Sequence, residues 1–118
     1  MHPGYTIGEV YLYRDLVDFR KSIHGLSALV EMEPGLQLFS QTLFVFTNRR
    51  RDKLKVLYWH RNGFCLWLKR LEKDRFPWWQ PDGNSSCTIR SEELEWLLDG
   101  IDIWKIKPHK SLNYMSYT

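Results

Sequence analysis

The chain has 118 residues, of which 43% are hydrophobic and 15% aromatic. This length and composition predict one folded domain whose core needs no disulfide or metal, and they exclude a disordered chain. No apolar run approaches the roughly 18–20 residues of a membrane span, and the N-terminus lacks the pattern of a secretory signal, so we expect a cytoplasmic protein. The net charge is +3, yet residues 49–75 hold ten of the seventeen Lys and Arg residues against three acids. Such a bias favours a polyanionic partner, with nucleic acid the first candidate.

The first predicted elements are a strand and a helix. Apolar and aromatic residues alternate in Val10–Arg14, which predicts a short strand. Between about Asp15 and Met32 apolar residues recur every three or four positions, which predicts an amphipathic helix with Asp15 or Asp18 as its cap. Pro34 and the glycine after it then end the helix.

Three closely spaced strands are predicted next. Leu43–Asn48, Leu54–His60 and Phe64–Arg70 are rich in apolar, β-branched and aromatic residues, and Asn62-Gly63 is typical of a tight hairpin turn. Connections this short predict antiparallel neighbours. Phe76–Gln80 is a further candidate strand.

A second helix is predicted at Ser91–Asp99, with Ser91 as its N-cap and Gly100 just past its end. The fold class is therefore α+β, and we expect a curved antiparallel β-meander of four to five strands with two helices packed on one face. Residues 1–107 are expected to form the single domain, and residues 108–118 a flexible C-terminal tail.

The basic stretch is the main candidate site. In a strand, Lys53 and Lys55 share one face while Leu54 and Val56 point into the core. The returning strand adds cations across the hairpin, which predicts a continuous basic strip on one sheet surface. The alternative is a solvated face whose lysines prevent edge-to-edge aggregation. The candidate nucleic-acid-binding residues are Arg49, Arg50, Arg51, Lys53, Lys55, Arg61, Lys69, Arg70 and Arg75, extended by Arg20 and Lys21 of the first helix, for which a local ion pair with an acid such as Asp18 is the alternative.

Four tryptophans lie within or just after the basic stretch. We interpret Trp59 and Trp67 as core anchors in preference to stacking platforms for bases, because tryptophans of small sheets usually fill cores. Trp78 and Trp79 must point to opposite faces if the chain is extended there. One of them is then exposed, which makes this pair a candidate partner interface.

A catalytic or metal site is not indicated. Asp52, Glu72 and Asp74 are the acids of the basic stretch and each is flanked by cations, whereas metal-assisted cleavage of a phosphodiester needs converging carboxylates. The four histidines are scattered, and the sequence contains no CxxC pair, nucleotide-binding loop or nucleophile elbow. We expect a protein without enzymatic activity, metal or cofactor.

Two stretches together resemble one known family. Residues 18–26, DFRKSIHGL, and residues 43–78, LFVFTNRRRDKLKVLYWHRNGFCLWLKRLEKDRFPW, are similar to the TnpB-type proteins of IS66 family insertion sequences, which are the products of the element's second open reading frame. The helix that ends at Gly100 resembles the closing L-x-x-L-L-x-G-I segment of the same family. The resemblance covers residues 8–104, and His60 stands where the family often carries an acid.

The resemblance implies a bacterial accessory protein of transposition that acts beside a separate DDE-type transposase, and it carries over no catalytic residues. Our leading hypothesis is a non-catalytic factor that binds DNA, at the ends of the element, through Arg49–Lys55 and Lys69–Arg75. The alternative is a module that docks on the transposase through exposed aromatics without direct DNA contact. A nuclease that depends on the acids of the basic stretch is a third interpretation. The sequence does not define an oligomeric state.

Overall fold

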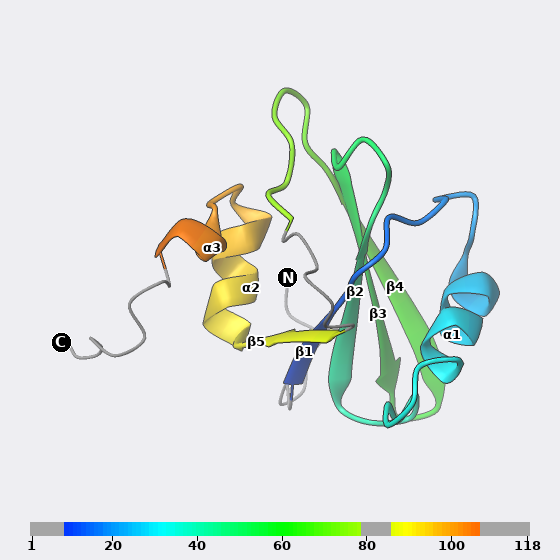
Figure 1. The fold of residues 1–118 in the computed structure, drawn as a ribbon. Coiled ribbons are helices and arrows are strands. Elements are labelled where there is room, and N and C mark those ends of the chain that lie inside the picture. The colour runs from blue at the N-terminus through cyan, green and yellow to red at the C-terminus, as the bar shows by residue number, and fades with distance from the viewer. Residues whose placement is uncertain (1–8, 79–85, 107–118) are drawn as a thin grey trace, which may run out of the picture.

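The computed structural model describes residues 9–78 and 86–106, which form a five-stranded sheet with helices against it (Figure 1). Its elements are β1 (Glu9–Tyr13), α1 (Ile23–Glu31), β2 (Thr42–Thr47), β3 (Lys53–His60), β4 (Gly63–Arg70), β5 (Ser86–Ile89), α2 (Ser91–Leu98) and α3 (Ile103–Ile106). The strand order across the sheet is β4-β3-β2-β1-β5. The α+β class predicted from the sequence is confirmed.

Strands β2, β3 and β4 form the predicted antiparallel meander. His60 pairs with Gly63, so the turn between β3 and β4 consists of Arg61 and Asn62, and the glycine opens the returning strand. A two-residue turn joins antiparallel neighbours directly because its twist matches that of the flanking strands. The hairpin therefore lies where the sequence predicts it, but its two turn residues are shifted by one position from the predicted pair Asn62-Gly63.

The complete sheet is mixed, because β1 runs parallel to β2. The chain between these two strands, residues 14–41, contains α1, and a crossover of this length returns the chain in the same direction. The outer strand β5 pairs antiparallel with β1. The expected all-antiparallel meander is thus corrected: it holds for β2–β4, where the connections are short, and fails at β1, where the connection is long.

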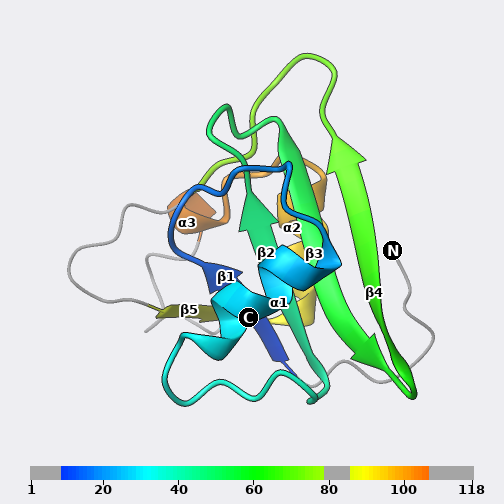
Figure 2. The same cartoon turned by 90° about the vertical axis from the view of Figure 1, so that its right-hand side faces the viewer.

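The two longer helices lie on opposite faces of the sheet, which corrects the expectation that both pack on one face (Figures 1 and 2). Adjacent residues of β1 belong to different cores: Tyr11 lies in the cluster that contains Leu26 of α1, whereas Leu12 lies in the cluster that contains Leu97 of α2. Strands β1 and β2 are buried on both sides. A strand with two apolar faces needs a cover on each face, so one layer of helices is not sufficient.

Helix α1 begins at Ile23, so neither predicted cap, Asp15 or Asp18, starts it. The residues before it have other partners. The Val17 N–H donates to the Thr47 carbonyl at 2.9 Å, and the Asp18 carboxylate accepts the N–H two residues ahead at 2.9 Å. The apolar spacing alone predicts a longer helix because it carries no information on these competing hydrogen bonds.

Helix α2 begins at Ser91 and ends before Gly100, which has a positive φ of 85°. The N-cap residue is Arg90 and not Ser91 as expected; its N–H donates to the Glu93 carboxylate at 2.8 Å. This contact satisfies an N–H group at the helix start, which is the usual purpose of a cap.

The predicted strand at Phe76–Gln80 is not formed in residues 76–78, the part that the structure describes. Phe76 and Trp78 are instead buried in the core on the α2 face. The Phe76 N–H donates to the Arg51 carbonyl at 2.6 Å, so its backbone braces a turn. The predicted tail, residues 108–118, lies outside the described residues.

Candidate nucleic-acid interface

The basic turn between β2 and β3 has a backbone held by one asparagine. The Arg51 N–H donates to the Asn48 carbonyl at 3.0 Å, and the half-buried Arg51 takes a left-handed φ of 58°. The Asn48 side chain crosses the turn, where its Nδ2 donates to Asp52 Oδ1 at 2.7 Å. Asn48 is only 9% exposed, whereas Arg49 and Arg50 are exposed. The turn therefore has a buried base and a charged tip.

A second segment braces the same turn. The Phe76 N–H binds the Arg51 carbonyl, and the Leu71 N–H donates to the Asp52 carbonyl at 2.8 Å. The hydrogen bond from Asn48 also lowers the pKa of the Asp52 carboxyl from its ordinary value. Asp52 is thus ionised, and it accepts a hydrogen bond that stabilises the turn.

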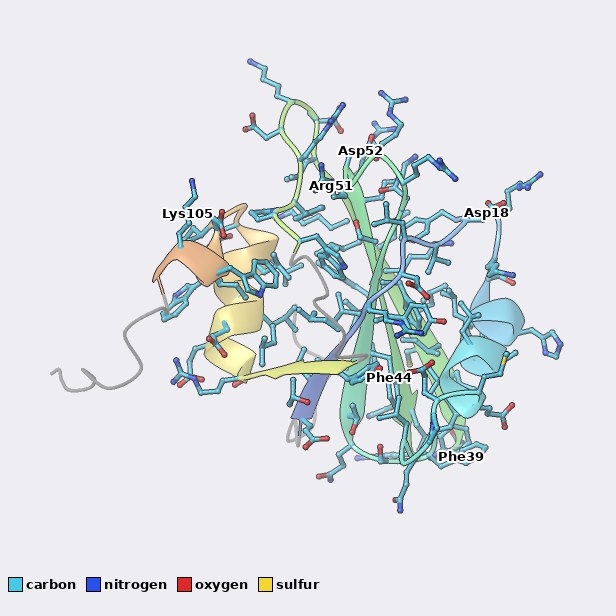
Figure 3. All side chains as sticks on the ribbon, in the orientation of Figure 1. Asp18, Phe39, Phe44, Arg51, Asp52 and Lys105 are labelled. Carbon is cyan, nitrogen blue, oxygen red and sulfur yellow. The ribbon has the colours of Figure 1, made fainter. Side chains whose placement is uncertain are left out.

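A groove of about 750 Å³ opens between this turn and the segment that precedes α1. We call it the basic groove, because its lining combines four cations with one acid and several apolar side chains: Leu16, Val17, Asp18, Phe19, Arg20, Asn48, Arg49, Arg50 and Lys53. Figure 3 shows Asp18 at the same end of the molecule as Arg51 and Asp52. The fold thus brings Arg20 beside cations that are distant from it in the sequence.

One wall of the basic groove is organised by Asp18. Its carboxylate accepts hydrogen bonds from the Arg20 N–H at 2.9 Å and from Arg20 Nε at 3.0 Å. The hydrogen bond from the Arg20 side chain is the main cause that lowers the pKa of Asp18 from 3.8 to about 2. The predicted local ion pair therefore exists, and it holds the guanidinium of Arg20 at the edge of the groove.

Lys55 of β3 forms hydrogen bonds with the backbone of the same wall. Its Nζ donates to the Phe19 carbonyl at 3.0 Å and to the Lys21 carbonyl at 2.8 Å, and it lies 4.8 Å from the centroid of the Phe19 ring. Burial, followed by the charge of Lys53, lowers the pKa of Lys55. The ammonium group is thus engaged with backbone oxygens, which makes Lys55 a positioning residue of the groove.

The cations of β3 and β4 do not share one face. Lys53 pairs with Arg70, and Leu54 pairs with Lys69, and residues paired directly across two strands point to the same side. Lys69 therefore lies on the α2 face with Leu54, where its Nζ donates to the Leu98 carbonyl at 2.8 Å. The continuous basic strip predicted from the sequence is divided between two surfaces.

The remaining predicted cations lie outside the lining of the basic groove. Arg61 lies in the turn at the opposite end of β3 from Lys53. Arg70 forms an exposed ion pair with Glu72 at 3.1 Å. Lys21 and Arg75 are exposed.

Trp78, one of the two residues of the predicted partner interface, is buried in the structure. Trp78 is 8% exposed, packs in the core on the α2 face, and has its ring centroid 6.4 Å from that of Trp104. Trp79 lies outside the described residues. Trp67 also packs against the α2-side core, in agreement with its interpretation as a core residue.

Sequence reasoning missed an exposed aromatic side chain, Phe39, in the connection before β2. Phe39 is 65% exposed, and its ring centroid lies 4.9 Å from that of Trp59 and 5.6 Å from that of Phe64. No periodicity or motif marks Phe39, because its neighbours Trp59 and Phe64 come from strands that the chain reaches later. Trp59, interpreted as a core anchor, belongs to this half-exposed cluster.

Within residues 9–78 and 86–106, no three His, Cys, Asp or Glu side chains are grouped as the ligands of a metal ion would be. None of the described helices is long and apolar enough to cross a membrane.

Comparison with known proteins identifies relatives. A protein-family model described as "IS66 Orf2 like protein" matches residues 8–108. Two similar curated proteins come from Sinorhizobium fredii (strain NBRC 101917 / NGR234). Uncharacterized protein y4jC is 33% identical over 91 residues, which is 77% of each chain. Uncharacterized protein y4hO is 33% identical over 105 residues, which is 89% of this chain and 90% of the relative. No solved structure matches the chain to a significant degree.

Proposed function

We propose that this chain, which belongs to the IS66 Orf2-like family and is an accessory protein of IS66 transposition, binds DNA through its basic groove. The observation that carries the proposal is the convergence of four cations on one groove: Arg20, Arg49, Arg50 and Lys53. The ligand is duplex DNA at the ends of the element, and the transposase of the same element carries out the chemistry.

The groove has the physical properties that phosphate binding needs. Exposed cations that neutralise phosphates release condensed counterions, which favours binding and makes it strongly dependent on salt. Asp18 and Arg20 are paired and offset each other, so the net charge of +3 on the groove lining comes from Arg49, Arg50 and Lys53. The hydrogen bonds of Asn48 hold the turn that carries Arg49 and Arg50, which lowers the entropy lost when the turn binds a ligand.

The proposal assigns the protein no catalytic step. Asp52 is held by Asn48 and Glu72 is paired with Arg70, so both acids have structural partners. Incubation of the full chain with element-end DNA and Mg²⁺ or Mn²⁺ is expected to leave the DNA intact. Metal-dependent cleavage that disappears in Asp52→Ala would show instead that the protein is a nuclease.

The test of the groove is a pair of charge reversals. Binding of a labelled duplex with the sequence of an element end, and of a random duplex, is measured by fluorescence anisotropy at several salt concentrations. The double variant Arg49→Glu/Arg50→Glu is expected to weaken binding by about tenfold or more and to lower the salt slope by about 1 for each lost phosphate contact. Lys105→Glu is the control for a charge reversal outside the groove, because Lys105 is an exposed cation on α3, on the other side of the sheet (Figure 3).

Two outcomes would overturn the proposal. One is absence of binding to either duplex at low salt. The other is equal affinity of the groove variant and the Lys105→Glu control. If the groove variant also supports transposition and still co-purifies with the transposase, the protein acts as an interaction module without DNA contact.

A further inference from the structure

An exposed aromatic cluster lies at the end of the molecule opposite the basic turn. Figure 3 shows Phe39 at one end and Arg51 and Asp52 at the other. Trp59 is in edge-to-face contact with Phe39 and with Phe64, at centroid distances of 4.9 Å in both cases. Phe39 nevertheless remains 65% exposed. Neighbouring aromatic rings that remain partly exposed form an apolar patch, and such a patch is a candidate binding surface.

A pocket of about 290 Å³ adjoins this cluster. We call it the aromatic pocket; its lining residues are Phe39, Ser40, Gln41, Trp59, His60 and Arg61. Two aromatic rings are thus combined with a hydroxyl, an amide, an imidazole and a guanidinium. The volume is at the low end of the range for ligand sites, so it suits one ring system.

We propose that the aromatic pocket binds an unpaired base of a single-stranded nucleic acid. The rings of Phe39 and Trp59 offer faces on which a base can stack, and every base has such a face. The Gln41 amide can both donate and accept hydrogen bonds at the edge of the base. The exposed guanidinium of Arg61 provides a cation for the adjoining phosphate.

The position of the pocket favours a single strand over a duplex. Lys53 of the basic groove and Trp59 of the aromatic pocket point to the same face of β3, and six residue steps separate them by roughly 20 Å at about 3.3 Å per residue. Helix α1 covers this face between the two sites (Figures 2 and 3). Duplex DNA is stiff, with a persistence length of about 50 nm, so a straight duplex in the groove does not bend around α1 to the pocket.

A protein partner is the competing occupant. A stable protein interface buries about 800 Å² on each partner. The aromatic pocket instead accommodates one ring, and four of its six lining residues are polar. Its chemistry therefore matches a nucleotide better than a protein surface.

The experiment uses the full chain and a labelled single strand of about 12 thymidines, a length within the site sizes of single-strand-binding folds. The uridine counterpart shows whether the unpaired base is supplied by DNA or RNA. Phe39→Ala is expected to weaken binding of at least one of these strands by about tenfold, because each stacked base contributes about 1–3 kcal/mol. Phe39→Tyr keeps the ring and is expected to retain the affinity. Met32→Ala is the control, since Met32 is 75% exposed but lies outside the pocket lining.

Three results would overturn the inference. Phe39→Ala could bind both strands as tightly as the wild type does, or the wild type could bind neither strand. The third result is a loss of affinity in Met32→Ala equal to that in Phe39→Ala. Unchanged single-strand affinity with loss of transposase co-purification in Phe39→Ala would assign the cluster to a protein partner. The inference does not depend on the basic groove. Phe39→Ala is expected to bind duplex DNA as the wild type does, whereas Arg49→Glu/Arg50→Glu tests the duplex site, so failure of one proposal is distinguishable from failure of the other.

Discussion

Lys53 and Lys55 lie two positions apart on the same face of β3, yet their charged groups have different surroundings. Lys53 lines the basic groove. The ammonium of Lys55 donates to two backbone carbonyls of the segment before α1. A cation that already donates its hydrogen bonds within the protein binds a phosphate less strongly than one that faces a groove.

We expect Lys55→Met to change mainly stability and Lys53→Met to change mainly DNA affinity, although both remove one charge. Lys55→Met leaves the Phe19 and Lys21 carbonyls without their charged donor and should lower the free energy of unfolding by about 1–3 kcal/mol. Lys53→Met should weaken duplex binding with little change in stability. Urea unfolding and anisotropy measure the two effects. A Lys55→Met protein that unfolds like the wild type but binds DNA as poorly as Lys53→Met would show that Lys55 contacts phosphate.

The lowered pKa of Asp18 predicts that stability decreases at acid pH. Its folded pKa of about 2 lies below the ordinary value of 3.8, so the unfolded chain takes up the proton first as the pH falls. The contribution of Asp18 to stability is therefore complete above about pH 4 and is lost as the pH falls towards 2. Urea unfolding between these pH values should show a smaller decline for Asp18→Asn than for the wild type. A decline in Asp18→Asn as steep as that of the wild type would contradict the role of the Arg20 contact.

A side chain of strand β4 forms a hydrogen bond with the end of helix α2. The Lys69 Nζ donates to the Leu98 carbonyl in the last turn of α2. The carbonyls at a helix C-terminus have no partner within the helix and carry the negative end of the helix dipole, so a cation there is stabilising. The last turn of α2 has no basic residue of its own. This explains why a lysine occupies the α2 face of β4, among apolar neighbours.

Lys69→Met should therefore destabilise the fold by about 1–2 kcal/mol and leave duplex affinity unchanged. Lys73→Met is the matched control, because Lys73 is exposed in the loop that follows β4. Chemical unfolding gives the stability and anisotropy gives the affinity. A loss of duplex affinity at constant stability would show instead that Lys69 contacts phosphate.

The whole molecule has two cores separated by one sheet. Leu26 and Val30 of α1 belong to one core, and Leu94, Leu97 and Leu98 of α2 belong to the other. The same sheet carries the basic groove at one end and the aromatic pocket at the other. The sheet is thus the rigid element that fixes the distance between two chemically different surfaces.

The separation of the two cores predicts that the effects of core mutations on the free energy of unfolding are additive. Val30→Ala and Leu97→Ala each remove buried methyl groups, and Val30 and Leu97 are both 0% exposed, so each should cost about 2–3 kcal/mol. The double variant should lose the sum of the two values to within about 0.5 kcal/mol, because the sites share no neighbours across the sheet. Denaturant unfolding of the four proteins gives the comparison. A clear departure from the sum would contradict two independent cores.

Local patterns in the sequence determined the types and positions of most elements. Alternation marked β1, apolar runs marked β2 to β4, and the Asn-Gly pair located the β3–β4 hairpin to within one residue, because these properties depend on residues close together in the chain. The concentration of cations in residues 49–75 is likewise visible without the structure, since charge is a property of composition and not of the fold.

Only the tertiary structure decided the direction of β1, the faces covered by α1 and α2, and the roles of individual cations. Lys55 is separated from its carbonyl partners by 36 and 34 residues, and Lys69 from its partner by 29. Phe39 becomes part of a pocket only when β3 and β4 fold beside it. A side chain's function depends on the groups within hydrogen-bonding or packing distance, and for these residues such groups are brought close only by folding.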